Sequence, residues 1–547
     1  MLRRLLLAAL ASLAAAGAAH ATELPEPVAR LMRAAQIPPE AAGVLVLRGD
    51  ATLVSHNPRQ IMQPASTVKL FTTMTALEQL GPVFRGRTEM LSSAPVVDGV
   101  LQGDLILRGG ADGDFNEDVL GHMLQALRNQ GIKAIKGDVV LDRQLFQPAR
   151  PDIGLPPFDE YPWAYYNVLP NALLINTNLL KVEMRSVGGK LSLAMMPPMD
   201  KVGVRSEMAA SDAPCPAWEN GWREPGVARD GDQIDVVLHG SFPRDCVKSI
   251  SVNVLDPHDY LERLLRATWS RLGGKLGGQV REAQAPTPPS LPAPAVNADT
   301  DATAASATPT APPAASTASG SSGSSATAPV LRLLAEHVSR PLPETLRDIH
   351  KNSDNTLAGA LFLSLGSLEA DPMLGSRPLP PDAAYPTTAA RADAAIRAWL
   401  RQRGIDDTGL VIDNGSGLSR LARATPAQVA GVLQAGLHSL WMPEFLASLP
   451  IAATDGTMRR RLKDSPAAMR ARIKTGTLKG VIAVAGYVQD AANQPVIVVA
   501  MLNDERVANG AGRAVLDALI DWVARSGAPA IPAVPAAPAV PAAPAAP

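Results

Sequence analysis

A serine and a lysine stand three residues apart in the stretch P-A-S-T-V-K-L, as Ser66 and Lys69. A helix turns by about 100° per residue, so positions i and i+3 share one face and these two side chains can meet. That arrangement suits a serine nucleophile activated by a lysine base. An ordinary polar first turn is the alternative, because serine is common at helix starts and lysine is common on helix surfaces.

Two further short motifs follow along the chain. K-N-S-D-N-T places Ser353, Asp354 and Asn355 in a row, and K-T-G-T-L begins at Lys474, just before the strand-forming run V-I-A-V-A-G-Y-V. The motifs S-x-x-K, S-D-N and K-T-G, in that order, are the signature of penicillin-recognising serine enzymes. The three together, with the first opening a helix and the last on a strand, favour the catalytic interpretation of Ser66.

The elements that must position these motifs can be predicted from hydrophobic patterns. Apolar residues recur at helical spacing after Lys69, and the run stops at Gly81, which suits a helix end. Runs rich in β-forming residues flank short turns near both ends of the chain. The predicted elements are a hairpin over 43–56, a buried helix ending at Gly81, a second hairpin over 485–502 and a final helix over 511–525.

The chain resembles the D-alanyl-D-alanine carboxypeptidase/endopeptidases of the class C low-molecular-mass penicillin-binding proteins, the peptidase S13 family. Besides the three motifs, the resemblance rests on G-D-L-I-L-R-G-G near residue 103, on D-N-G-S-G-L-S-R at 413–420 and on A-G-Y after K-T-G-T-L. The family usually has D-G-S-G-L-S, so Asn414 is a small departure. The resemblance implies an α+β fold: a penicillin-binding transpeptidase/β-lactamase-like domain, with an antiparallel sheet flanked by helices, and nested, mostly β inserted domains.

The spacing of the motifs fits that architecture, because well over 200 residues separate Ser66 from Ser353. Residues 283–328 and the tail are dominated by small residues and proline, and such segments cannot bury enough apolar area to order themselves. We therefore expect a signal peptide over 1–21, a serine peptidase domain over 22–90 plus 329–526, β-rich inserted domains over 91–282, a disordered linker over 283–328 and an Ala/Pro-rich tail over 527–547.

The chemistry of acyl transfer, taken with the resemblance, assigns the catalytic set. Ser66 is the expected nucleophile and Lys69 its base, which requires that burial and the positive charge of Lys474 lower the pKa of Lys69. Ser353 would relay a proton to the leaving amine, and Asn355 would hold Lys69 and the substrate amide. Whether the lysine alone is the acylation base in this superfamily is disputed.

The K-T-G-T motif is assigned to substrate binding. Lys474 and Thr475 would hold the terminal carboxylate of the substrate, and Gly476 would give the substrate strand room to approach. The backbone N–H groups of Ser66 and Thr477 are the expected oxyanion hole.

Other polar residues near the motifs receive structural interpretations. Ser416 in D-N-G-S-G is assigned to a turn, because a nucleophile elbow needs glycine where Asn414 stands. His350 is expected to be structural, since the mechanism uses no histidine. Asp354 is expected to face the structure, and Lys351 to be a surface residue or to lie behind the site.

The N-terminal pattern indicates the cellular compartment of the protein, and the composition excludes several functional classes. Two arginines, an apolar run and Ala19-His20-Ala21 indicate a cleaved secretory signal rather than a membrane anchor. Cys215 and Cys246 then predict one disulfide, with a metal-binding pair as the alternative. The net charge of −1 does not suggest nucleic-acid binding, and no zinc-peptidase or nucleotide motif is present, so we expect no metal and no cofactor.

The expected function is D-Ala-D-Ala carboxypeptidase and endopeptidase action on peptidoglycan stem peptides and cross-links in the periplasm, with β-lactams as inhibitors. The mature chain is expected to have no transmembrane anchor, and its oligomeric state stays open. One alternative is β-lactam hydrolysis by the same serine; no E-x-x-L-N motif of the class A enzymes is present, so slow acyl release is expected. The other is a non-catalytic peptidoglycan-binding or scaffolding protein, against which the intact motifs argue.

Overall fold

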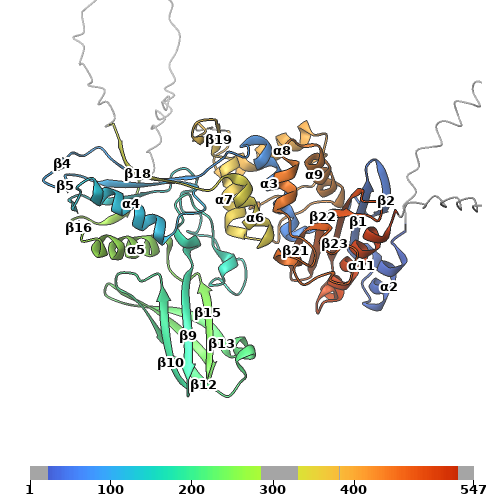
Figure 1. Ribbon diagram of the computed structural model, residues 1–547, viewed down its shortest axis with the longest axis horizontal. Helices are drawn as coiled ribbons and strands as arrows, with labels where there is room; N and C mark the ends of the chain where they lie inside the picture. Colours follow the sequence, from blue (N-terminus) through green and yellow to red (C-terminus); the bar gives the residue numbers. More distant parts are fainter. Residues whose placement is uncertain (1–22, 285–329, 381, 383, 528–547) are drawn as a thin grey trace, which may run out of the picture.

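The computed structural model describes residues 23–284, 330–380, 382 and 384–527 (Figure 1). The expected signal peptide lies outside the described residues. So do all but the first two residues of the expected linker and all but Gly527 of the expected tail.

The principal sheet is antiparallel and joins the two ends of the described chain. The predicted hairpin at its start is present, with Arg48 opposite Ala51, and the strand that follows the turn at 490–494 pairs with the first strand of that hairpin. Among the described residues its strands run in the order β2 (Ala51–His56), β1 (Ala42–Arg48), β23 (Pro495–Asn503), β22 (Val481–Gln489) and β21 (Ala471–Leu478).

Helices cover both faces of this sheet, which explains why β22 and β23 are buried almost end to end. Alternate residues of a strand point to opposite faces. Thus Val484 and Val498 enter a core with α2 (Glu26–Ala34) and α11 (Ala511–Arg525), whereas Ala485 and Val499 enter a second core on the other face. That second core contains α3 (Lys69–Gln79), α6 (Leu342–Lys351), α7 (Asn355–Leu365), α8 (Thr388–Gln402), α9 (Pro426–His438) and α10 (Met442–Ser448).

The buried helix predicted after Lys69 is α3, and Gly81 follows its C-cap residue, Leu80, with a left-handed φ of 75°. A residue without a Cβ adopts that conformation at little cost, so the glycine ends the helix. The helix is buried along nearly its whole length because α7, α8 and α9 pack around it.

The inserted part has its own sheets and its own core, on the opposite side of the molecule from the principal sheet (Figure 1). Its larger sheet has the order β17 (Val280–Glu282), β8 (Val139–Asp142), β6 (Leu105–Gly110), β3 (Arg87–Ser92) and β18 (Arg332–Val338), and beside it lie α4 (Glu117–Asn129) and α5 (Pro257–Arg271). A smaller sheet has the order β16 (Lys275–Leu276), β7 (Ala134–Ile135), β5 (Val100–Leu101) and β4 (Val96–Val97).

A second unit of strands, over residues 180–252, is nested within this insertion and projects away from it (Figure 1). One of its sheets contains β10 (Lys190–Met196), β9 (Leu180–Val187) and β15 (Cys246–Val252). The other contains β11 (Val202–Ser206), β12 (Ala209–Ser211), β13 (Trp222–Asp230) and β14 (Gln233–Pro243).

The pairing of β18 changes where the inserted part begins and ends. Val338 lies opposite Arg87 in an antiparallel ladder, so β3 and β18 belong to one sheet. The residues from 330 to 338, which we expected in the peptidase domain, lie with the inserted part, and the expected boundary at 90/91 falls inside β3. The hairpin of β19 (Leu368–Asp371) and β20 (Gly375–Pro378) completes the set of strands described.

Candidate active site

Ser66 lies in a 3-10 turn, Ala65–Val68, and α3 begins at the next residue, Lys69. With three residues per turn, positions i and i+3 stand directly above one another, so the turn brings Ser66 and Lys69 together. Ala65 adopts a left-handed φ of 47°. Such a conformation costs a non-glycine residue roughly 1–3 kcal/mol, which the packing of the turn against β21 and β22 must offset.

The Lys69 amine is fully buried and lies among three oxygen atoms. Its Nζ is 3.1 Å from Ser66 Oγ, 2.8 Å from Asn355 Oδ1 and 2.5 Å from the backbone carbonyl oxygen of Ser416. The side chain is therefore fixed in one position, with Ser66 as one of its direct partners.

Burial lowers the pKa of Lys69 well below its ordinary value, because an ammonium group loses its hydration there. The nearby charge of Lys474 lowers the pKa further, whereas the carboxylate of Asp354 raises it. The two lowering effects are the ones that the sequence led us to expect, and they favour a neutral amine beside Ser66.

The S-D-N motif lies at the start of α7. Asp354 is the N-cap and accepts a hydrogen bond from the backbone N–H of Leu357, so it closes the helix end. Asn355 is the first helical residue; besides its contact with Lys69, its Nδ2 donates to the carbonyl oxygen of Tyr166 at 3.2 Å. Ser353 precedes the cap with a left-handed φ of 57°. The helix start thus links the lysine to the inserted part.

Lys474 is fully buried on β21 and connects the second motif with the third. Its Nζ donates to Ser353 Oγ at 2.9 Å and to the carbonyl oxygen of Thr475 at 2.6 Å. Burial lowers the pKa of Lys474 to about 7. Two hydrogen-bonded groups, Lys69 with Ser66 and Asn355, and Lys474 with Ser353, are here together called the polar cluster, and the charges of their two lysines interact.

Gly476 lies against the turn that carries Ser66. A Cβ on Gly476 would lie 2.9 Å from the carbonyl oxygen of Pro64 and 3.0 Å from the backbone nitrogen of Ser66. The missing side chain thus makes room for the Ser66 turn, whereas the sequence led us to expect room for a substrate strand. The strand and the serine turn can approach each other only because residue 476 is glycine.

β21 is an edge strand of the principal sheet, so one side of its backbone has no partner strand in that sheet. The N–H of Ile473 points to this outer side, where it donates to the carbonyl oxygen of Pro450. Backbone N–H groups alternate between the two sides of a strand, so those of Thr475 and Thr477 point outward as well. The side chain of Thr475 contacts Thr457, with 2.8 Å between the two Oγ1 atoms.

Comparison with known proteins decides the family. The model of the D-Ala-D-Ala carboxypeptidase 3 (S13) family matches residues 26–297 and 315–526. The chain belongs to this family.

Individual relatives of this S13 chain agree with that result. The chain is 25% identical over 474 residues to the D-alanyl-D-alanine carboxypeptidase DacB of Haemophilus influenzae, covering 82% of each chain. It is 26% identical over 494 residues to a D-alanyl-D-alanine carboxypeptidase of an Actinomadura species, covering 88% of this chain and 81% of the relative. The crystal structure of penicillin binding protein 4 (dacB) from Haemophilus influenzae has a TM-score of 0.65 at 24% identity, covers 91% of this chain and 98% of its own, and supports the same fold.

In this S13 chain the three motifs open onto a cleft of about 640 Å³. Ser66, Ser353, Asn355, Thr475 and Thr477 line it, together with parts of the inserted segment from Phe158 to Leu179. The cleft therefore lies between the peptidase part and the inserted part, and the partly exposed Ser66 faces it.

Several residues of the cleft were not anticipated from the sequence. The carbonyl oxygen of Ser416 contacts Lys69, and no side-chain pattern predicts a backbone contact of this kind. The loop F-D-E-Y-P-W-A-Y-Y (158–166) also lines the cleft, and Arg420 lies 5.4 Å above the ring of Phe158. Only 4% of the residues in the chain are aromatic, so this group of aromatic side chains was a signal in the sequence that could have indicated the loop as part of the site.

His350 and Lys351, which were not expected to take part in catalysis, both have polar partners within the protein. The fully buried His350 lies between Thr73 Oγ1 at 3.0 Å and Ser448 Oγ at 2.7 Å, and burial lowers its pKa well below the ordinary value. Lys351 is mostly buried and pairs with Asp455, so it is not a surface residue.

The segment around Ser416 forms the expected turn. Asn414 Oδ1 accepts hydrogen bonds from both the backbone N–H and the hydroxyl of Ser416. Gly417 lies so close to the Ser66 turn that a Cβ there would be 2.2 Å from the carbonyl oxygen of Ala65. The turn thus supports the serine from a second side.

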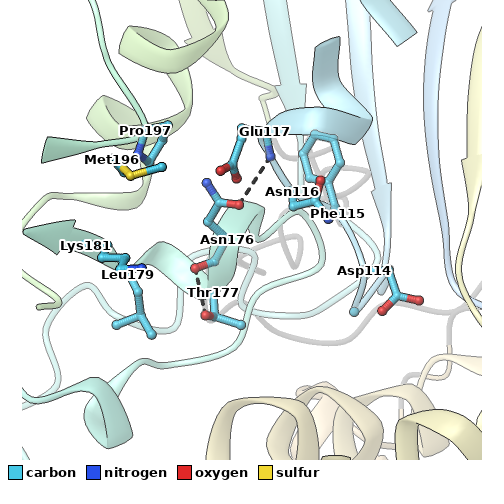
Figure 2. A pocket seen from close by; sticks show the side chains of 11 residues that line it. Asp114, Phe115, Asn116, Glu117, Asn176, Thr177, Leu179, Lys181, Met196 and Pro197 are labelled. Atoms are coloured by element: carbon cyan, nitrogen blue, oxygen red, sulfur yellow. Dashed lines mark hydrogen bonds between the residues drawn. The ribbon is translucent and has the colours of Figure 1, made fainter. Parts of the chain in front are cut away.

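A second, more open hollow of about 450 Å³ borders the cleft, with Thr177 and Leu179 lining both (Figure 2). Asn176, Thr177 and Asn178 all have left-handed φ values, near 50°. Asn176 Oδ1 accepts from the N–H of Glu117 at 3.2 Å, the contact drawn in Figure 2, and Asn178 Nδ2 donates to Leu255 O. These side-chain amides hold the strained segment in place.

Cys215 and Cys246 are joined by a disulfide, so they do not form a metal-binding pair. The bond ties the segment before β13 to the start of β15 in the nested unit. Within the part of the chain that the structure describes, no group of three or more His, Cys, Asp or Glu side chains could hold a metal ion. None of the helices described there is long and apolar enough to cross a membrane.

Proposed function

We propose that this S13 family member is a serine-type D-Ala-D-Ala carboxypeptidase and endopeptidase of peptidoglycan that acts through an acyl-enzyme on Ser66. The observation that carries the proposal is the buried Lys69 amine, in contact with Ser66 Oγ and with a pKa held well below its ordinary value. Nucleophilic catalysis by serine requires such a base within hydrogen-bond distance.

The neighbours of Lys69 support its role as the base. A neutral amine has two N–H groups and one lone pair. The two N–H groups fit the oxygen atoms of Asn355 and Ser416, which leaves the lone pair for the hydroxyl proton of Ser66. When Ser66 Oγ attacks the carbonyl carbon between two D-alanines, its proton passes to Lys69 and the carbonyl oxygen becomes negative.

Collapse of this intermediate breaks the bond to the leaving amine, which must gain a proton. In the proposed step Ser353, which accepts a hydrogen bond from Lys474 Nζ, gives its hydroxyl proton to the amine and takes in its place the proton that Lys69 received from Ser66, so that both side chains return to their starting states. Water then hydrolyses the ester on Ser66. A scaffold without activity has no need of this buried and internally repulsive pair of lysines.

The outer edge of β21 supplies the groups that bind the substrate. The N–H of Thr477 faces that edge and, with the N–H of Ser66, forms the proposed oxyanion hole. The side chains of Thr475 and Thr477 line the cleft beside the buried charge of Lys474, which fits the carboxylate of the leaving residue. An extended peptide can lie along this edge as an added strand, beyond the contact of Ile473 with Pro450.

Inhibition by β-lactams follows from the same geometry, because the strained amide of a penicillin acylates the same serine. A crystal structure of penicillin binding protein 4 from Haemophilus influenzae, a structural relative of this chain, is complexed with a β-lactam. Export to the periplasm is part of the proposal and rests on the N-terminal signal pattern.

Digestion of isolated muropeptides tests the proposed function. The purified protein is incubated with a monomeric pentapeptide and with a cross-linked dimer, and the products are identified by mass. We expect loss of D-alanine from the first, cleavage of the second into monomers, and inhibition of both reactions by prior treatment with a penicillin. A folded protein that leaves both substrates intact and takes up no penicillin would disprove the proposal.

A further inference from the structure

A basic pocket of about 420 Å³ adjoins the active-site cleft. Its lining includes Arg459, Arg460 and Arg513, and also Arg461, which is ion-paired with Asp517. Thr457, Thr475 and Thr477 line both the pocket and the cleft. Lys474 points from β21 toward Ser353, so the side chains of Thr475 and Thr477 point to the opposite face of the strand. The two spaces therefore meet around the free edge of β21.

The name arginine cluster is used here for Arg459, Arg460 and Arg513, which come from two distant segments. Arg459 and Arg460 follow the 3-10 turn Gly456–Met458, and Arg513 lies in the first turn of α11. All three are exposed, and their side chains have no hydrogen-bond or ion-pair partner among the described residues. The adjacent Arg461 is different, because it is mostly buried and bonded to Asp517.

Three cations that line one pocket without a counter-ion repel one another and create a positive potential. Arginine is also the side chain best suited to bind carboxylates, through two parallel N–H groups. The chemistry of the pocket thus fits a ligand that carries carboxylate groups.

We propose that the arginine cluster is a specificity site for the leaving half of a cross-linked stem peptide. This inference rests on the proposed function, in which Thr475 and Thr477 bind the carboxylate of the leaving residue. Groups that extend beyond that carboxylate reach the arginine cluster. Free D-alanine has nothing to place there, whereas the leaving half of a cross-link is a second stem peptide with carboxylates of its own.

The arginine cluster thus favours cross-link cleavage over trimming. Hydrogen bonds to charged groups contribute enough that losing them lowers kcat/KM by about 10- to 100-fold. This loss in kcat/KM applies to the cross-linked substrate alone. The preference for the cross-linked substrate also weakens as the salt concentration increases, because the arginine cluster is exposed and its charges are screened.

The test uses the variant R459Q/R460Q/R513Q, in which glutamine removes each positive charge but keeps an unbranched side chain with a polar end. Its matched control is K190Q/R271Q/R332Q, which removes three positive charges from exposed positions in the inserted part. For the wild type and both variants, kcat/KM is measured on a monomeric pentapeptide, on a cross-linked dimer and on the same dimer with its distal carboxylates converted to amides. The rate of penicillin acylation shows whether the catalytic serine is intact.

We expect R459Q/R460Q/R513Q to lose about 10- to 100-fold in kcat/KM on the dimer and less than about threefold on the pentapeptide, with penicillin acylation unchanged. The wild type is expected to have a lower kcat/KM on the amidated dimer than on the unmodified dimer. R459Q/R460Q/R513Q is expected to have the same kcat/KM on both dimers. The control variant is expected to behave as the wild type. Equal losses on pentapeptide and dimer, or no loss on either, would overturn the specificity site while leaving the proposed function intact. A wild type that neither cleaves the substrates nor takes up penicillin would instead refute the proposed function.

Discussion

Replacing Gly476 by alanine tests the close contact between β21 and the Ser66 turn. The new Cβ would lie 2.9 Å from Pro64 O and 3.0 Å from both Ala65 Cβ and Ser66 N, all closer than an ordinary contact of about 3.4–4 Å. Two of these neighbours are backbone atoms that cannot rotate away, so the strand and the turn must separate. Overpacking of this kind costs about 1–3 kcal/mol of unfolding free energy.

The same separation displaces the N–H of Ser66 from the proposed oxyanion hole. Loss of one such donor lowers the rate by about 10²- to 10³-fold, so Gly476→Ala should acylate with penicillin that much more slowly. Chemical denaturation measures the stability, and stopped-flow or time-resolved mass spectrometry measures the acylation.

Gly121→Ala is the matched control. A Cβ at Gly121, in the interior of α4, meets only one atom, at 3.9 Å. This variant should therefore gain about 0.5–1 kcal/mol, because alanine is the better helix former, and acylate at the wild-type rate. If Gly476→Ala also kept the wild-type stability and acylation rate, the packing argument for the third motif would be refuted.

The remaining predictions concern pH. Because the charge of Lys474 lowers the pKa of Lys69, Lys474→Gln should shift the rising limb of the acylation rate to higher pH; an unshifted limb would show that the two lysines are not coupled. The hydrogen bond from His337 to Asp112, at 2.6 Å, raises the pKa of His337 above 6.5. That pair stabilises the fold fully below pH 6.5 and less as pH rises through the raised pKa. His337→Ala should therefore cost more unfolding free energy at pH 6 than at pH 8.5, and an equal cost at both would contradict this.

Local patterns in the sequence predicted the elements around the site but not their long-range pairing. The hairpin before Ser66, the helix after it and the final helix each follow from hydrophobic periodicity within one segment. The ladder between β3 and β18 joins strands that are far apart in the chain, and neither strand alone indicates its partner. The domain boundaries that we expected were displaced for this reason.

Side-chain motifs predicted most of the polar cluster, whereas backbone groups and surface pairs could not be read from them. Ser416 contacts Lys69 through its carbonyl oxygen, a group that every residue has. The run R-R-R at 459–461 is visible in the sequence. Only the fold shows that Arg461 is ion-paired with Asp517 and that Arg513 lines the same pocket as this run.

Intact-protein mass spectrometry of Ser66→Ala with a penicillin tests the central claim most directly. The wild type should gain the mass of one penicillin molecule. The folded variant, checked by circular dichroism, should gain none, because the acyl group has no other activated oxygen in the cleft to bond to. Lys69→Ala is the comparison that keeps the nucleophile, and it should still be labelled, about 10²- to 10⁴-fold more slowly. Stoichiometric labelling of the folded Ser66→Ala protein would contradict the assignment of Ser66 as the nucleophile.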